Sequence, residues 1–226
     1  MDLADGRVND IPDRIHQNLI RAIVKGLSDT PMVLKGGAAL LLVYSLGRHS
    51  VDIDYDSSVK PDVLGRLDEI MRSTRMDFKI LDRKRTDTTS RMLIHYKTGR
   101  VKNGLLKIEI KNNRTINPIH VQSEPGFPVY TIDKLCEQKL SAISTRTKAR
   151  DLYDLAHIAR NFEPELSDNN IAKLQSLAKD TSLRERFFED WYYEKTTRNK
   201  SIDTMLKALQ TVLGPSPSRD DTDKPG

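Results

Sequence analysis

Residues 32–55 read MVLKGGAALLLVYSLGRHSVDIDY, and this stretch predicts how the N-terminal half of the chain folds. Three apolar residues at its start are typical of a short buried strand, and a glycine pair follows them. A nearly all-apolar helix is then expected over 38–46, ending at Gly47, because glycine commonly follows the last turn of a helix. Residues 51–55 alternate apolar and acidic side chains, as a strand with one exposed face does. The order of these elements predicts an α/β arrangement.

The acidic strand is a candidate metal and phosphate site. Asp52 and Asp54 are expected on one face, because side chains two residues apart on a strand point the same way. Neighbouring carboxylates repel unless a cation lies between them, and Mg²⁺ takes hard oxygen ligands together with substrate phosphates. Gly36 and Gly37 would let the backbone approach a triphosphate, and the helix after them presents free N–H groups. Glu109, in an alternating strand pattern, is a candidate third acid for a two-metal site.

Each part of this pattern has a simpler interpretation when it is taken alone. A D-x-D pair is usually a solvated strand face, and a Gly-Gly pair is usually a turn. The combination of strand, glycine pair, apolar helix and acidic strand favours the functional interpretation.

Apolar periodicity predicts the remaining elements. A helix is expected over 11–27, and another of about 14 residues after Pro61. Strands are expected at 78–81, 92–96 and 105–110. The segment 112–128 holds three prolines and is expected to be a loop. Helices are expected at 131–145, 149–161, 168–180, 182–195 and 200–213.

The chain is therefore expected to have two domains and a tail. Residues 1–128 form an α/β domain, residues 129–213 form a helical domain, and residues 214–226 lack apolar anchors and are expected to be disordered.

Composition restricts the class of protein. The chain has 226 residues and a formal net charge of +5, and its single cysteine, Cys136, excludes a disulfide framework. The N-terminus lacks an apolar signal core, and no apolar run approaches the roughly 20 residues that span a bilayer. A soluble cytoplasmic protein with no membrane partner is expected.

Positive charge is concentrated between residues 83 and 114. This basic strip consists of Arg83, Lys84, Arg85, Arg91, Lys97, Arg100, Lys102, Lys107, Lys111 and Arg114. Only Asp87 and Glu109 oppose these ten side chains. Such a strip suits the phosphates of a nucleic acid, and the alternative is a solvated face of lysine-rich strands.

Two blocks of sequence resemble a known family. The first is Lys35-Gly36-Gly37-Ala38-Ala39-Leu40 with Tyr44, Arg48, Ser50, Asp52, Ile53 and Asp54. The second is Glu137-Gln138-Lys139-Leu140-Ser141-Ala142 through Arg146 and Arg150-Asp151-Leu152-Tyr153-Asp154-Leu155. In this order they resemble the AbiEii/AbiGii-type nucleotidyltransferase toxins of the DNA polymerase β-like nucleotidyltransferase superfamily. Ala38 is a departure, because many members carry a hydroxyl residue after the glycine pair.

The resemblance implies an α+β nucleotidyltransferase fold, a mixed sheet with flanking helices, followed by a helical C-terminal domain. It implies metal-dependent transfer of a nucleotide from an NTP to an RNA acceptor, with Mg²⁺ or Mn²⁺ as the metal. In related toxins the acceptor is the tRNA 3′ end, and the protein acts as the toxin of a toxin–antitoxin or phage-defence system. A cognate antitoxin is therefore a possible partner.

The resemblance also assigns residues. It gives catalytic roles to Asp52, Asp54, Lys139 and Asp151, and it makes Asp52 and Asp54 the metal ligands. Binding of substrate or phosphate is assigned to Lys35, Gly36, Gly37, Arg48, Ser50 and Asp154. Glu109 is a positional match to the superfamily's third acid.

Other interpretations of these residues stay open at this point. Lys139 could be a snorkelling surface lysine, and Asp151 and Asp154 could be helix N-terminal acids, with Arg150 and Asp154 paired one turn apart. Two other functions also compete, a small-molecule nucleotidyltransferase of the antibiotic-modifying type and a non-catalytic protein that keeps the fold to bind RNA or a partner.

Overall fold

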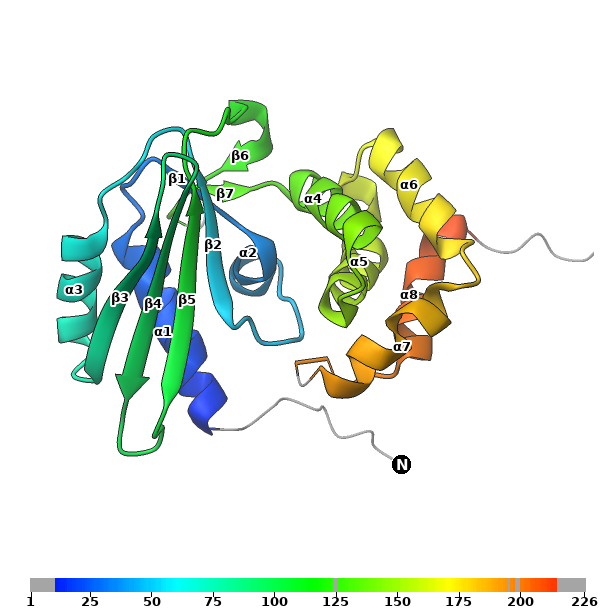
Figure 1. Cartoon of the computed structure of the whole chain (residues 1–226). Helices are drawn as coiled ribbons and strands as arrows, with labels where there is room; N and C mark the ends of the chain where they lie inside the picture. The colour runs from blue at the N-terminus through cyan, green and yellow to red at the C-terminus, as the bar shows by residue number, and fades with distance from the viewer. Residues whose placement is uncertain (1–10, 124–125, 195, 198–199, 215–226) are drawn as a thin grey trace, which may run out of the picture.

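A seven-stranded mixed sheet forms the frame of the N-terminal part of the computed structural model, which describes residues 11–123, 126–194, 196–197 and 200–214 (Figure 1). The strands are β1 (Met32–Lys35), β2 (Asp52–Ser57), β3 (Asp77–Arg85), β4 (Thr89–Lys97), β5 (Gly104–Lys111), β6 (Val121–Gln122) and β7 (Val129–Tyr130). Their order across the sheet is β3-β4-β5-β2-β1-β7-β6. The acidic strand β2 therefore lies at the centre of the sheet. It is antiparallel to β1 and parallel to β5.

Helices cover one face of β3, β4 and β5. Helices α1 (Ile11–Gly26) and α3 (Leu64–Ser73) lie on this face in Figure 1. His16 of α1 hydrogen-bonds the Tyr96 hydroxyl of β4 at 2.8 Å. The even-numbered residues of β4 and β5, from Met92 to Ile110, are buried beneath the helices, whereas the odd-numbered residues point to the other side.

The C-terminal part is helical. Its helices are α4 (Ile132–Thr145), α5 (Ala149–Phe162), α6 (Asp168–Ala178), α7 (Leu183–Tyr193) and α8 (Ile202–Leu209). Short 3₁₀ helices lie at Pro118–His120, Glu163–Glu165 and Gln210–Leu213. No helix in the described ranges is long and apolar enough to cross a membrane.

Tyr44 joins the two parts at the end of helix α2 (Gly36–Val43). Its hydroxyl donates to the carbonyl oxygen of Tyr130 at 2.9 Å, and its own carbonyl oxygen lies 2.8 Å from Nε2 of His157 on α5. Its ring packs edge-on against Phe162. One continuous apolar core therefore runs from the sheet into the helices.

The mixed sheet, the flanking helices and the helical C-terminal part confirm the expected fold class. The expected boundary at residue 128 stays a prediction, and the last strand of the sheet begins just past it, at Val129. The expected tail lies outside the described residues, except for Gly214.

Several boundaries differ from the sequence-based expectations; for example, the strand expected at 78–81 runs from Asp77 to Arg85. Helix α2 ends at Val43 rather than near Gly47, because Ser45 adopts a left-handed conformation (φ 54°) and the Leu46 N–H returns to the Leu40 carbonyl. Helix α3 has 10 residues and begins only at Leu64. The expected loop at 112–128 contains β6, because its backbone pairs with β7.

Candidate active site

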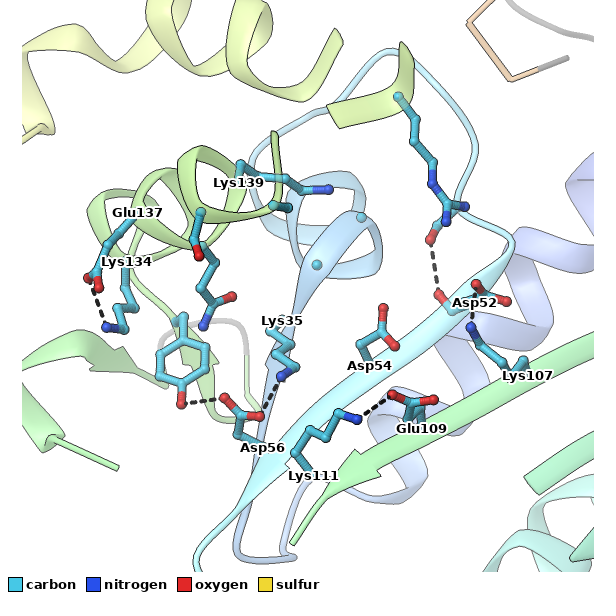
Figure 2. Close-up of a pocket in the computed structure, with 18 of the residues that line it drawn as sticks. Lys35, Asp52, Asp54, Asp56, Lys107, Glu109, Lys111, Lys134, Glu137 and Lys139 are labelled. Carbon is cyan, nitrogen blue, oxygen red and sulfur yellow. Dashed lines mark hydrogen bonds and ion pairs between the residues drawn. The ribbon is translucent and has the colours of Figure 1, made fainter. Parts of the chain in front are cut away.

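A pocket of about 560 Å³ lies where the centre of the sheet meets α4 and the start of α5. Nine Lys and Arg side chains and five Asp and Glu side chains line it. Figure 2 shows the acids of β2 and β5 with the amines of Lys35 on β1 and of Lys107 and Lys111 on β5 close to them, whereas Lys134 of α4 is paired with Glu137 on the same helix. The pocket is therefore strongly charged and positive on balance, which suits a polyphosphate and its metal ion.

The two glycines at the start of α2 allow a close approach of the chain. Gly36 has a φ of +68°, a conformation that glycine adopts without strain, and a Cβ atom there would lie 3.0 Å from Asp54 Oδ2. A Cβ on Gly37 would lie 3.0 Å from the Arg48 guanidinium and 3.2 Å from Ser50 Oγ. The free N–H groups of the first turn of α2 consequently lie at the wall of the pocket.

Strand β2 presents Asp52 and Asp54 on the pocket side, as expected. Asp52 forms an ion pair with Lys107 of β5 at 2.9 Å. Among the described residues, Asp54 is the one pocket acid whose carboxylate has no hydrogen bond or ion pair, and Figure 2 shows it directed into open space. Burial and the charge of Asp52 raise the pKa of Asp54, although Lys107 opposes this shift. Asp54 is thus a carboxylate without a counter-charge of its own.

Glu109 lies directly opposite Asp54 in the sheet register. Its carboxylate binds Arg91 at 2.6 Å and Lys111 at 3.0 Å. Burial acts to raise the pKa of Glu109, but the hydrogen bonds from Lys111 and Arg91 outweigh it and lower the pKa. The expected third acid is thus beside the other two, with its charge already balanced.

The chemistry of the donors fits a divalent metal held by Asp52 and Asp54. In the part of the chain that the structure describes, no three His, Cys, Asp or Glu side chains form a ready-made metal cluster. Mg²⁺ commonly takes only one or two protein carboxylates and completes its shell with water and substrate phosphates. The unpaired Asp54 carboxylate beside Asp52 provides that minimal donor set.

Arg48 and Ser50 line the same pocket but are held by protein partners. Arg48 is buried and binds Asp154 of α5 through two hydrogen bonds of 2.7 Å. The Ser50 hydroxyl donates to the Asp52 carbonyl oxygen at 2.9 Å, and Gln17 donates to the Ser50 carbonyl. Both residues therefore fix the loop that leads into β2.

The later sequence block forms a buried ionic cluster. Lys139 Nζ lies 2.8 Å from Asp151 Oδ1 and 2.6 Å from Asp154 Oδ2, while Arg146 binds Asp151 at 2.7 Å. Burial opposes ionisation of both aspartates, but the adjacent cations lower their pKa values below the usual range.

Two alternative interpretations of this block are wrong. Lys139 does not snorkel to solvent, because it is buried against the aspartates. Asp154 pairs with Arg48 and Lys139 rather than with Arg150 one turn away. Asp151 does lie in the first turn of α5, so its favourable position in the helix dipole is compatible with its place in the cluster.

Several lining residues of the pocket were not among the candidate site residues, and Asp56, Arg114 and Arg150 are three of them. Asp56 continues the two-residue period of Asp52 and Asp54, and this signal was readable, but the strand was expected to end one residue earlier. Its carboxylate accepts hydrogen bonds from Lys35 and from the Tyr130 hydroxyl.

The other two residues are Arg114 and Arg150. Both line the pocket, and their guanidinium groups have no ion pair or hydrogen bond with any described residue. Arg114 belongs to the basic strip and Arg150 to the second block, but nothing in the sequence marks either as facing the carboxylates.

Comparison with known proteins places this geometry in context. The family model described as nucleotidyl transferase AbiEii toxin, type IV toxin–antitoxin system, matches residues 18–213. No protein of curated function matches the sequence at a significant level.

Solved structures give the same picture. A Helicobacter pylori protein described as a nucleotidyltransferase is 31% identical, with a TM-score of 0.83 over 90% of this chain and 93% of its own. JHP933 from the same organism is 30% identical, with a TM-score of 0.83 over 90% of each chain. MenT4, a nucleotidyltransferase toxin of Mycobacterium tuberculosis, is 18% identical, with a TM-score of 0.55 over 92% of this chain and 85% of its own, and shares the fold.

Proposed function

The chain belongs to the AbiEii family of nucleotidyltransferase toxins, and we propose that it transfers a nucleoside monophosphate from an NTP to a hydroxyl of RNA at the tRNA 3′ end. Membership implies an NTP substrate and an antitoxin partner. The proposed reaction is attack of the acceptor hydroxyl on the α-phosphate, with release of pyrophosphate. Asp52 and Asp54 would hold Mg²⁺ or Mn²⁺.

A single observation carries the proposal. The Asp54 carboxylate lies against the glycine turn of α2, points into a pocket rich in cations, and has no counter-charge among the described residues. A structural aspartate in such surroundings would be paired, because a partly buried carboxylate without an ion pair is unfavourable. A metal ion bound to an NTP would supply the missing positive charge.

The residues of the pocket then have separate tasks. When bound, the metal ion activates the hydroxyl and neutralises charge that develops on the phosphates. The N–H groups of the first turn of α2 and the unpaired Arg114 and Arg150 face the triphosphate. Lys139 also lines the pocket, and the two aspartates behind it fix its position.

The test is transfer from each of four labelled NTPs to total RNA, to purified tRNA and to tRNA lacking its 3′-terminal nucleotides. Label should accumulate on intact tRNA, EDTA should stop the reaction, and Mg²⁺ or Mn²⁺ should restore it. Label on a small molecule, with none on RNA, would establish the antibiotic-type alternative instead.

The toxin role has its own test in cells. Expression of the wild type should arrest growth, whereas the Asp52→Ala protein should be tolerated. Arrest by both proteins would show that toxicity does not depend on transfer.

A further inference from the structure

The side of the sheet that carries the catalytic acids continues well beyond them. In the register, Asp54 lies opposite Glu109, which lies opposite Arg91, which lies opposite Lys84. This row crosses four strands, and neighbouring strands are separated by about 4.8 Å, so Lys84 stands about 14 Å from Asp54. Figure 1 shows no helix in front of β3, β4 and β5 on this side.

This surface, which we call the open sheet face, consists of Lys79, Leu81, Arg83, Lys84, Leu93, Lys97 and Leu105. Leu105 is 50% exposed, and Leu81 and Leu93 of the adjacent strands are partly exposed. Leu81 also lines a second pocket, of about 640 Å³, which is formed by residues of β3, β4, the turn before β5 and the first residue of β5. The face thus combines partly exposed leucines with exposed cations, and it begins at the catalytic row.

The cations on the open sheet face are free to bind a ligand. Lys79, Arg83, Lys84 and Lys97 are exposed, and none of them forms an ion pair or side-chain hydrogen bond within the described part of the chain. Asp77 is the one acid on the lining of the second pocket. Positive charge without internal partners suits a chain of phosphates.

The basic strip is therefore divided between two surfaces. Arg91 is paired with Glu109 within the catalytic row, and Lys107 is paired with Asp52 beside that row. Arg85 points to the other face, where it binds Asp62, because a β-bulge shifts the register between Asp82 and Lys84. Only some residues of the basic strip can therefore contact one ligand on the open sheet face. Lys79 is not part of the strip, but it lies on the same face.

We propose that the acceptor RNA crosses the open sheet face as a single strand on its way to the catalytic carboxylates, an inference that rests on the proposed function. Its phosphates lie on Lys79, Arg83, Lys84 and Lys97, and its sugars and bases lie on the three leucines. Because Lys84 stands about 14 Å from Asp54, the open sheet face lies outside the part of the pocket that would hold the NTP. Unpaired positive charge favours RNA over a protein partner, because an apolar protein contact needs no row of cations.

The experiment compares two triple charge reversals. The test variant is Lys79→Glu/Arg83→Glu/Lys97→Glu. The matched control is Arg21→Glu/Lys25→Glu/Arg75→Glu, which changes three exposed cations on α1 and after α3, on the covered side of the sheet. Both variants change the net charge equally, so a difference between them reports position rather than total charge. The acceptor is the RNA that the wild type labels.

Three lost phosphate contacts should reduce the log–log salt slope of RNA binding by about 2, at roughly 0.7 per contact for a single strand. The KM for the RNA acceptor should rise at least tenfold, while the KM for NTP and the transfer rate to a trinucleotide acceptor stay within twofold of the wild type. The control should behave as the wild type does in every measurement. If the triple reversal does not fold, Lys79→Ala/Lys97→Ala should still reduce the slope by about 1.4.

The outcomes separate the two proposals. A test variant that matches the control in RNA binding and in KM overturns the open sheet face as the acceptor path while transfer to RNA stands. A wild type that labels no RNA overturns the proposed function and this inference together. A protein partner on this face would leave the KM for RNA unchanged and also counts against the inference.

Discussion

Arg48 and Asp154, which are 106 residues apart in the sequence, form a bidentate ion pair with two N–O distances of 2.7 Å. The exposed fraction of the Arg48 side chain is 4% and that of Asp154 is 0%. This pair joins the loop before β2 to helix α5, and it holds the catalytic strand against the ionic cluster around Lys139.

Removing the negative charge of this pair should destabilise the protein strongly. Asp154→Asn leaves the Arg48 and Lys139 charges buried without full compensation, so we expect a loss of about 3–5 kcal/mol in the free energy of unfolding. Asp29→Asn, which breaks an exposed pair with Arg66, should cost less than about 1 kcal/mol. Urea denaturation of the three proteins measures both values, and equal losses would contradict a structural role for the buried pair.

Asp54→Asn should abolish transfer without harming the fold. The raised pKa of Asp54 means that its stabilising contribution is present below the unfolded value of 3.8 and is lost as the pH rises through the higher folded value. At pH 7 the charged carboxylate therefore costs stability, and the amide removes that cost.

The melting temperature of this variant should equal or exceed that of the wild type, since about 1 kcal/mol corresponds to about 2–4 °C for a chain of this size. Transfer should fall at least a thousandfold. A stable variant that keeps normal transfer would remove Asp54 from the metal site.

The sequence predicted the order and type of the main elements because their apolar periods are clear. Strand β2 was expected from the alternation of Asp52, Ile53 and Asp54, and β5 from the same pattern around Glu109. In both strands one face is buried, so apolar residues alternate with polar residues, and this alternation is visible in the sequence.

The charge partners could not be predicted in the same way. The pairing of Arg48 with Asp154 depends on how two distant segments pack, and no local spacing encodes it. The same is true of Lys107, which meets Asp52 only because β2 and β5 are adjacent and parallel in the sheet. The expected end of α2 failed for another reason, since the helix ends at Val43 and Ser45 adopts a left-handed conformation two residues before Gly47.

Arg150→Ala should weaken substrate use without affecting stability. The guanidinium lines the pocket and has no partner among the described residues, so its removal leaves no buried charge. We expect the KM for NTP to rise about tenfold, which corresponds to the roughly 1.4 kcal/mol of one charge-assisted hydrogen bond. Lys134→Ala is the control at the same pocket, because that lysine is bound to Glu137 on the same helix. Equal KM values for both variants would argue against a triphosphate contact by Arg150.

Stability should decline as the solution becomes mildly acidic. Burial lowers the pKa of both His16 and His157, so the unfolded chain binds protons that the folded chain does not. The stability that these neutral imidazoles provide is complete above the unfolded pKa of 6.5, and it is lost as the pH falls through the lower folded values. Urea denaturation between pH 7.5 and pH 5 should show this slope, and His16→Gln/His157→Gln should flatten it. If the pH dependence of the free energy of unfolding were unchanged in the double variant, groups other than these two histidines would be responsible for it.

Gly36→Ala tests whether the turn before α2 holds the catalytic carboxylate in place. At a φ of +68° an alanine costs about 1–2 kcal/mol of backbone strain, and its methyl group would lie 3.0 Å from Asp54 Oδ2. Asp54 must move by a few tenths of an ångström. Because a misplacement of about 1 Å at a reacting centre can reduce the rate by a factor of about 100, we expect a smaller but measurable loss of rate. Gly65→Ala is the matched control, because it lies in α3 with no atom within 4 Å of the added methyl group and should stabilise the protein by about 0.5–1 kcal/mol. Transfer rates and melting temperatures of both variants distinguish the effects. A Gly36→Ala protein that loses stability but keeps the wild-type rate would show that the turn is structural and does not position Asp54.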